Sequence, residues 1–205
     1  KGLPSRQAEG PFAFEYNGNY YLTYPYVRED TEVLAYAMSK NPMGPYEYKG
    51  LIMAEHENGC WTNHHSIVNF KGQWYLFYHH NAFSPHFDKN RSAQIEKLYF
   101  NPDGTIQEVK PTLRGVGPIK ASQKVQIDRY SCIDGAAIEY LDTTDYFKGW
   151  KTVFAKAGDK VCFNEVNFGK KAPKTAVVCV KADAGAQLEI AAGKAVVSVE
   201  VPESQ

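Results

Sequence analysis

One short pattern occurs twice in this chain, and this repeat constrains the fold more than any other feature. The segments "YNGNYYLTY" and "FKGQWYLFY" align when Gly18 is placed on Gly72, 54 residues further along. In this register Leu22 matches Leu76, and Tyr20, Tyr21 and Tyr24 match Trp74, Tyr75 and Tyr78. Aromatic runs on both sides of an Asn-Gly or Lys-Gly pair are typical of β-hairpins. The repeat therefore predicts two equivalent hairpins.

A second hairpin pattern with an Asn-Pro pair follows each copy, in "SKNPMGPYEYKG" and in "YFNPDGTIQEVK". The repeating unit thus has about four strands, and its length is close to the period of roughly 40 to 50 residues typical of β-propeller blades. Propellers close with roughly four to eight blades, so we expect the natural protein to continue before Lys1. The alternative is a β-sandwich in which the internal similarity is coincidental.

Composition divides the chain into two parts. Of the 28 aromatic residues, 20 precede Gly115, whereas Lys, Ala and Val dominate from Pro118 onward, with alternation as in "AVVSVEV". We predict an all-β chain with no helix longer than a turn or two: a partial propeller over 1–115 and a β-sandwich (jelly roll) over 116–205. The formal net charge of zero indicates neither nucleic acid nor membrane as a partner.

The four cysteines show no metal-binding spacing. Cys60, Cys132, Cys162 and Cys179 include no C-x-x-C pair. Cys162 and Cys179 lie in the apolar runs "KVCFNEV" and "AVVCVKA", so we expect both to be small buried side chains rather than members of a disulfide.

The repeat register also points to a candidate site. It places Glu9 of "AEGPF" opposite Asn63 and Gly10 opposite His64 of "TNHHS". The first strand of each propeller blade lines the central channel, so we expect Glu9 and His64 to converge near the axis. A carboxylic acid there suits glycoside hydrolysis, in which it protonates the leaving oxygen. The alternative for Glu9 is a solvated surface residue.

Five of the six histidines lie between His64 and His86. A zinc site of several histidines is disfavoured because H-E-x-x-H is absent and adjacent histidines point to opposite faces of a strand. A single axial histidine, His64, is the favoured interpretation. Arg91 begins the strand that follows, and it either binds a sugar hydroxyl in the channel or is a surface arginine.

Four segments carry a family resemblance: "AEGPFAFEYNGNYYLTY", "MSKNPMGPYEYKGLIM", "TNHHSIVNFKGQWYLFYHH" and "RSAQIEKLYFNPDGTIQEV". In order and spacing, over about residues 5–113, they resemble the later blades of glycoside hydrolase family 43. The resemblance implies a five-bladed propeller that hydrolyses xylosyl or arabinofuranosyl linkages of plant polysaccharides or oligosaccharides with inversion. The general acid of that family matches Glu9 in "EGP". Its catalytic aspartates belong to the first two blades, which precede this chain, so we expect the fragment alone to be inactive.

The same resemblance extends to ligands and location. The axial histidine of the family, often near a calcium ion, matches His64, and a channel arginine matches Arg91. Calcium is thus the implied cofactor, without an organic one. A carbohydrate is the implied partner, and the implied location is secreted or periplasmic.

From Val125 the chain resembles a carbohydrate-binding module of family 6. This resemblance implies that Asp128 in "VQIDRYS" is a structural calcium ligand and that Phe154 stacks on sugar. Lys160 stands where an aromatic residue is common, and we expect the module to be truncated. Three alternatives stay open: a structural sandwich, a non-catalytic glycan-binding protein, and a scaffold propeller.

Overall fold

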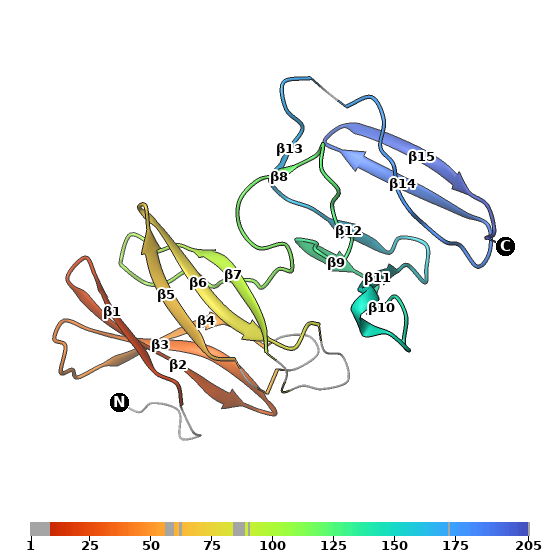
Figure 1. Ribbon diagram of the computed structural model, residues 1–205. Helices are drawn as coiled ribbons and strands as arrows, with labels where there is room; N and C mark the ends of the chain where they lie inside the picture. Colours follow the sequence, from red (N-terminus) through yellow and green to blue (C-terminus); the bar gives the residue numbers. More distant parts are fainter. Residues whose placement is uncertain are drawn as a thin grey trace. The chain divides into compact units, whose positions relative to one another are not determined.

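The computed structural model describes residues 9–55, 60–61, 63–83, 89, 91–171 and 173–204 (Figure 1). Within these ranges the regular structure is almost entirely β-strand, and the one helical element is the 3-10 helix η1, Tyr146–Lys148. This confirms the predicted all-β class. None of the helical structure in the described ranges is long and apolar enough to span a membrane.

The first copy of the repeat is an antiparallel sheet, hereafter the first sheet. Its strands follow the chain order and are β1 (Phe12–Tyr16), β2 (Asn19–Arg28), β3 (Thr31–Ser39) and β4 (Glu47–Met53). Asn17 and Gly18 form the two-residue turn between β1 and β2 with φ of 50° and 67°. Positive φ at both positions is the requirement of the type I′ turn, which Asn-Gly meets at low cost.

The second copy forms a second antiparallel sheet. Its strands are β5 (His65–Phe70), β6 (Gln73–His80) and β7 (Ser92–Leu98). Lys71 and Gly72 repeat the tight turn, with φ of 53° and 82°. The two predicted hairpins are therefore present, 54 residues apart. The fourth strand predicted for this copy is reduced, among the described residues, to the single bridge Phe100↔Ile106.

The main core lies between the two sheets. They stack so that one face of the first sheet packs against the non-equivalent face of the second sheet. Leu76 and Tyr78 of β6 are in this core, together with Tyr21 and Tyr36 of the first sheet. Tyr24, which is equivalent to Tyr78, belongs instead to a separate apolar cluster on the opposite face of the first sheet. Equivalent faces therefore point in the same direction, as radial repetition of sheets requires. The five-bladed ring itself stays a prediction.

Between Leu98 and Phe168 the described chain forms short strand pairs instead of a larger sheet. The pairs are β8 (Ile119–Lys120) with β13 (Val166–Asn167), β9 (Cys132–Asp134) with β12 (Lys160–Cys162), and β10 (Ala137–Tyr140) with β11 (Trp150–Val153). The β8–β13 pair is parallel and the other two are antiparallel. The predicted sandwich stays a prediction.

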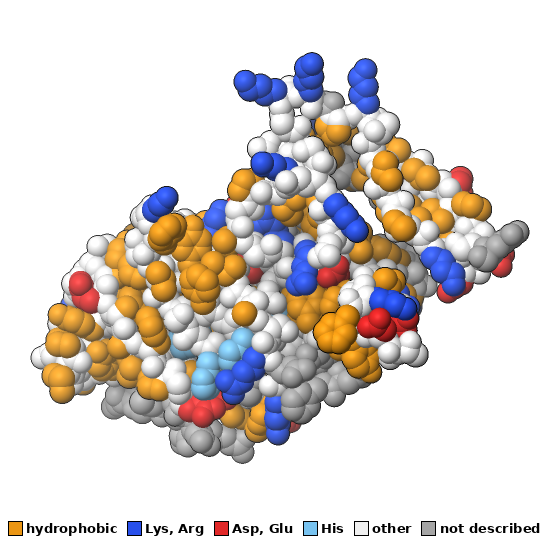
Figure 2. Space-filling model, in the orientation of Figure 1, with side chains coloured by type: hydrophobic (Ala, Val, Ile, Leu, Met, Phe, Trp, Pro, Cys, Tyr) orange, Lys and Arg blue, Asp and Glu red, His pale blue; other side chains and the backbone are white. Residues whose placement is uncertain are grey.

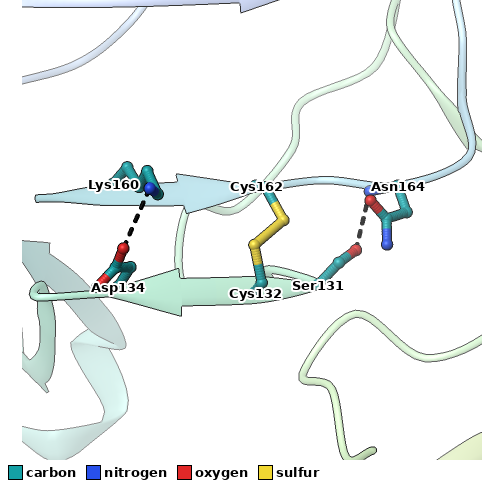
Figure 3. Close-up of a disulfide and its surroundings, with 6 residues drawn as sticks. All are labelled: Ser131, Cys132, Asp134, Lys160, Cys162 and Asn164. Carbon is teal, nitrogen blue, oxygen red and sulfur yellow. Dashed lines mark hydrogen bonds and ion pairs between the residues drawn. A yellow bond between two sulfur atoms is a disulfide. The ribbon is translucent and has the colours of Figure 1, made fainter.

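A disulfide joins Cys132 to Cys162 (Figure 3). These residues are register partners at the ends of β9 and β12, so their sulfur atoms meet across the strand pair. The expectation that Cys162 is a free buried side chain was wrong, because strand pairing brings together two cysteines 30 residues apart. Cys179 is also exposed, contrary to expectation, since its apolar run forms no strand in the described chain; Cys60 is buried.

By its internal contacts the chain divides into two compact units, Lys1–Asn167 and Phe168–Gln205. The second unit contains one hairpin, β14 (Ala186–Ala192) and β15 (Ala195–Val201). The boundary expected between 115 and 116 lies inside the first unit, and it stays a prediction.

Candidate active site

Glu9 and His64 meet at equivalent ends of the two sheets. Glu9 precedes β1 and His64 precedes β5, and Glu9 Oε1 lies 3.5 Å from His64 Nε2. Half of the Glu9 side chain and about a third of the His64 side chain remain exposed. Figure 2 shows histidine atoms at the surface of this face next to acidic and basic side chains. The structure thus brings together the two residues that the repeat register predicted to converge.

Gly10 makes this contact possible. Its φ of 51° is in the left-handed region, and a Cβ placed there would lie 3.1 Å from atoms of the His64 ring. Glycine adopts this conformation without steric cost and leaves room for the ring. Gly10 therefore permits the close approach of the "EGP" segment to His64.

The second strand of each hairpin holds the segment that carries its part of the site. The Glu9 N–H donates to Pro25 O of β2 at 3.4 Å. In the second sheet the His79 N–H donates to His64 O at 3.3 Å, and the His64 N–H donates to His79 Nε2 at 3.3 Å. Pro25 and His79 are equivalent in the repeat, so the same strand position supports both segments.

Glu32 also belongs to this site, and sequence reasoning missed it. It lies at the start of β3 with 5% of its surface exposed, and its Oε2 accepts a hydrogen bond of 2.6 Å from the Asn63 N–H. Burial raises the pKa of Glu32, and the nearby Glu9 carboxylate raises it further, while the Asn63 N–H opposes this shift. The charged stretch "REDTE" is typical of an exposed turn. The available signal was alternation along β3, which places Glu32 on the same face as Leu34.

His65 points to a different partner from His64. The Thr23 hydroxyl donates to Phe12 O at 3.0 Å, so it accepts from His65 Nε2 at 2.6 Å. Burial, together with the charge of His64, lowers the pKa of His65 to about 4. His65 is therefore a neutral residue packed between the sheets. His86, the last member of the histidine group, lies outside the described residues.

Within the described residues, none of the other three predicted site residues forms a hydrogen bond or ion pair with Glu9. Arg91 is exposed directly before β7 and, in the described residues, forms no ion pair with Glu9. Phe154 follows β11 and is 41% exposed. Asp128 is buried, with its Oδ2 3.4 Å from Arg129 Nε. Their predicted roles stay predictions.

The sequence of this chain matches one family model over half of its length. The model is that of glycosyl hydrolases family 43, and the match covers residues 4–106. The chain belongs to glycosyl hydrolases family 43. Its match contains both sheets and the Glu9–His64 pair.

Two of the similar curated proteins are named as a β-xylosidase and an arabinoxylan arabinofuranohydrolase. A β-xylosidase of Xylanibacter ruminicola is 42% identical over 52% of this chain and 32% of its own length. An arabinoxylan arabinofuranohydrolase of Paenibacillus polymyxa is 27% identical over 95% of this chain and 35% of its own length. The chain spans about a third of the length of these curated relatives.

A solved structure of family 43 shows similar coverage. It is a β-xylosidase/α-arabinofuranosidase from a compost microbial metagenome, crystallised with xylotriose in a calcium-free form. It is 42% identical over 49% of this chain and 29% of its own chain, with a TM-score of 0.44.

The described residues do not by themselves fit a calcium ion. Calcium takes about six to eight oxygen ligands, and no group of three or more His, Cys, Asp and Glu residues that could hold a metal ion occurs in the described ranges. His64 is paired with Glu9, and Asp128 lies beside Arg129. The roles of His64 and Asp128 at calcium sites in this family 43 protein stay predictions.

Proposed function

We propose that the intact protein is an inverting glycoside hydrolase that cleaves xylosyl or arabinofuranosyl linkages in plant polysaccharides or oligosaccharides. Glu9 is its general acid. The observation that carries this proposal is the contact between the Glu9 carboxyl and the His64 ring at equivalent ends of two stacked sheets. The names of the family 43 relatives support the substrate class.

The chemistry requires a proton donor that reaches the leaving oxygen of the sugar. Glu9 suits this step because half of its side chain is exposed while its backbone is tied to β2. His64 holds the carboxyl from one side. No aspartate of this chain is assigned as the base or as the residue that orients the acid, since family resemblance places both in earlier blades. The 205-residue chain alone is therefore expected to be inactive.

Four further assignments belong to this proposal. Arg91 binds sugar in the channel, and Phe154 stacks on sugar in a carbohydrate-binding sandwich. A calcium ion near His64 or Asp128 would need further oxygen ligands, because no group of three or more His, Cys, Asp and Glu residues that could hold a metal ion occurs in the described ranges. The protein works outside the cytoplasm, a location supported by the Cys132–Cys162 disulfide, because disulfides persist in oxidising compartments.

The test is Glu9→Gln in the intact protein. This change removes the proton donor and keeps the shape of the side chain, so hydrolysis of unactivated xylo- or arabino-oligosaccharides should fall by about 10² to 10⁴-fold. Aryl glycosides with good leaving groups should lose much less, and the Kd of the sugar, measured by calorimetry, should change little. The matched control is Glu108→Gln at an exposed position, which should leave all three values unchanged.

An equal loss of sugar binding and of hydrolysis in Glu9→Gln would argue against the acid role. The alternative, a non-catalytic glycan-binding protein, predicts that the wild-type protein hydrolyses none of these substrates and that Glu9→Gln weakens sugar binding.

A further inference from the structure

Glu32 connects the first sheet to the segment that leads into the second sheet. Its backbone N–H donates to Cys60 O at 2.9 Å, and its carboxyl Oε2 accepts from the Asn63 N–H at 2.6 Å. One residue of β3 therefore holds two points of the segment that ends at His64. The Glu32 side chain lies on the face of β3 that packs against the second sheet, since it shares this face with Leu34 of the main core.

A carboxyl group is a costly choice for this position. Removing a carboxylate from water is unfavourable, and the Glu32 side chain is almost completely buried next to a second carboxyl, that of Glu9. A single backbone N–H can be bound by a neutral amide or hydroxyl oxygen at lower cost. The hydrogen bond from Asn63 and the influence of the nearby Glu9 carboxylate link this buried group to both halves of the site.

We propose that Glu32 is a positioning residue for the Glu9–His64 pair. The Asn63 N–H bond fixes the backbone that enters His64, and the His64 ring in turn contacts Glu9 and lies against Gly10. The inference depends on the proposed function, because it assigns Glu32 a part in orienting the general acid.

The test compares three variants of the intact enzyme on two substrates. Glu32→Ala removes the anchor, and Glu32→Asp withdraws the carboxyl from Asn63. A displacement of about 1 Å at a catalytic group can cost about 100-fold in rate. In both variants we therefore expect kcat on unactivated oligosaccharides to fall by about 10- to 100-fold, with KM within about threefold of wild type.

Glu32→Gln should recover most of this loss, because its amide oxygen can accept the same hydrogen bond from Asn63. On aryl glycosides with good leaving groups all three variants should stay within about fivefold of wild type, since that step needs little help from an acid. Glu108→Gln is again the matched control, as an exposed glutamate that takes part in none of these contacts.

Two outcomes would overturn the inference. The first is wild-type kcat on unactivated substrates in both Glu32→Ala and Glu32→Asp. The second is an equal loss on both substrate classes with no recovery in Glu32→Gln, which indicates a purely structural role. If one variant does not fold, as judged by circular dichroism, the remaining two still decide between these results. The outcome for Glu9→Gln is separate: a leaving-group-dependent loss there, without one at Glu32, refutes this inference alone.

Discussion

The two hairpins of the repeat are alike at their turns and different at the opposite ends. At the turns, Gly18 and Gly72 adopt the same left-handed backbone after a residue that also has positive φ. At the opposite ends, Gly10 lies against the His64 ring, although the two residues occupy equivalent positions in the repeat. The stacking of the sheets brings these two equivalent ends together. Repetition thus supplies the scaffold, and divergence at equivalent positions supplies a site that neither copy contains alone.

The layer between the sheets shows the same contrast. At its apolar end the Phe14 ring stacks on Tyr21 with centroids 4.6 Å apart and lies 5.3 Å from the Trp74 ring. At its polar end Thr23 meets His65, and Glu32 meets Asn63. Apolar packing therefore stabilises one end, and hydrogen bonds between buried polar groups define the other.

The largest expected effect is on the apolar packing. Leu76→Ala should lower the free energy of unfolding by about 2 to 5 kcal/mol, because Leu76 is fully buried between the sheets and its truncation leaves a cavity. Urea unfolding of the intact protein, with hydrogen exchange of β6 amides as a local probe, measures this loss. Leu76→Met conserves volume and should cost less than about 1.5 kcal/mol. Equal losses in the two variants would contradict the tight packing described for this layer.

The polar end should respond to pH through His65. Burial lowers its folded pKa to about 4 from 6.5, so folding excludes a proton that the unfolded chain binds below pH 6.5. The stability from this group is complete above pH 6.5 and is lost as pH falls toward 4, by about 3 kcal/mol in total.

Urea midpoints of the intact protein, measured from about pH 7.5 down to about pH 4, test this loss. His65→Gln should flatten that part of the pH profile, since the variant has no group to titrate at this position. An identical pH dependence in the variant would show that His65 does not carry the effect.

The smallest expected effect on stability is at the glycines of the first copy. Gly10→Ala and Gly18→Ala should each cost about 1 to 2 kcal/mol, because alanine disfavours the left-handed backbone at both positions. Only at Gly10 would the new Cβ press on the His64 ring, whereas nothing lies within 4 Å of a Cβ at Gly18. Hydrolysis by the intact enzyme should therefore fall in Gly10→Ala and stay unchanged in Gly18→Ala. Equal activity of the two variants would show that the close approach of Gly10 to His64 is not required for hydrolysis.

Local patterns in the sequence were enough to predict the hairpins and the convergence of Glu9 and His64. Tight turns depend on the two residues that form them, and a repeat register carries equivalent positions into equivalent places. The burial of Glu32 and the Cys132–Cys162 disulfide depend on which strands meet in space. Neither a charged hairpin tip nor a cysteine spacing of 30 residues reveals such contacts, so sequence reasoning missed the first and misjudged the second.

Because Glu9 and His64 come from different sheets, turnover reports on whether those sheets are docked. A molecule whose two hairpins are both formed but separated keeps its β-strand spectrum and has no assembled acid. Mild denaturant should therefore abolish hydrolysis at a lower concentration than the one at which the circular dichroism signal changes. The difference between these two denaturant concentrations measures how stably the two sheets are docked.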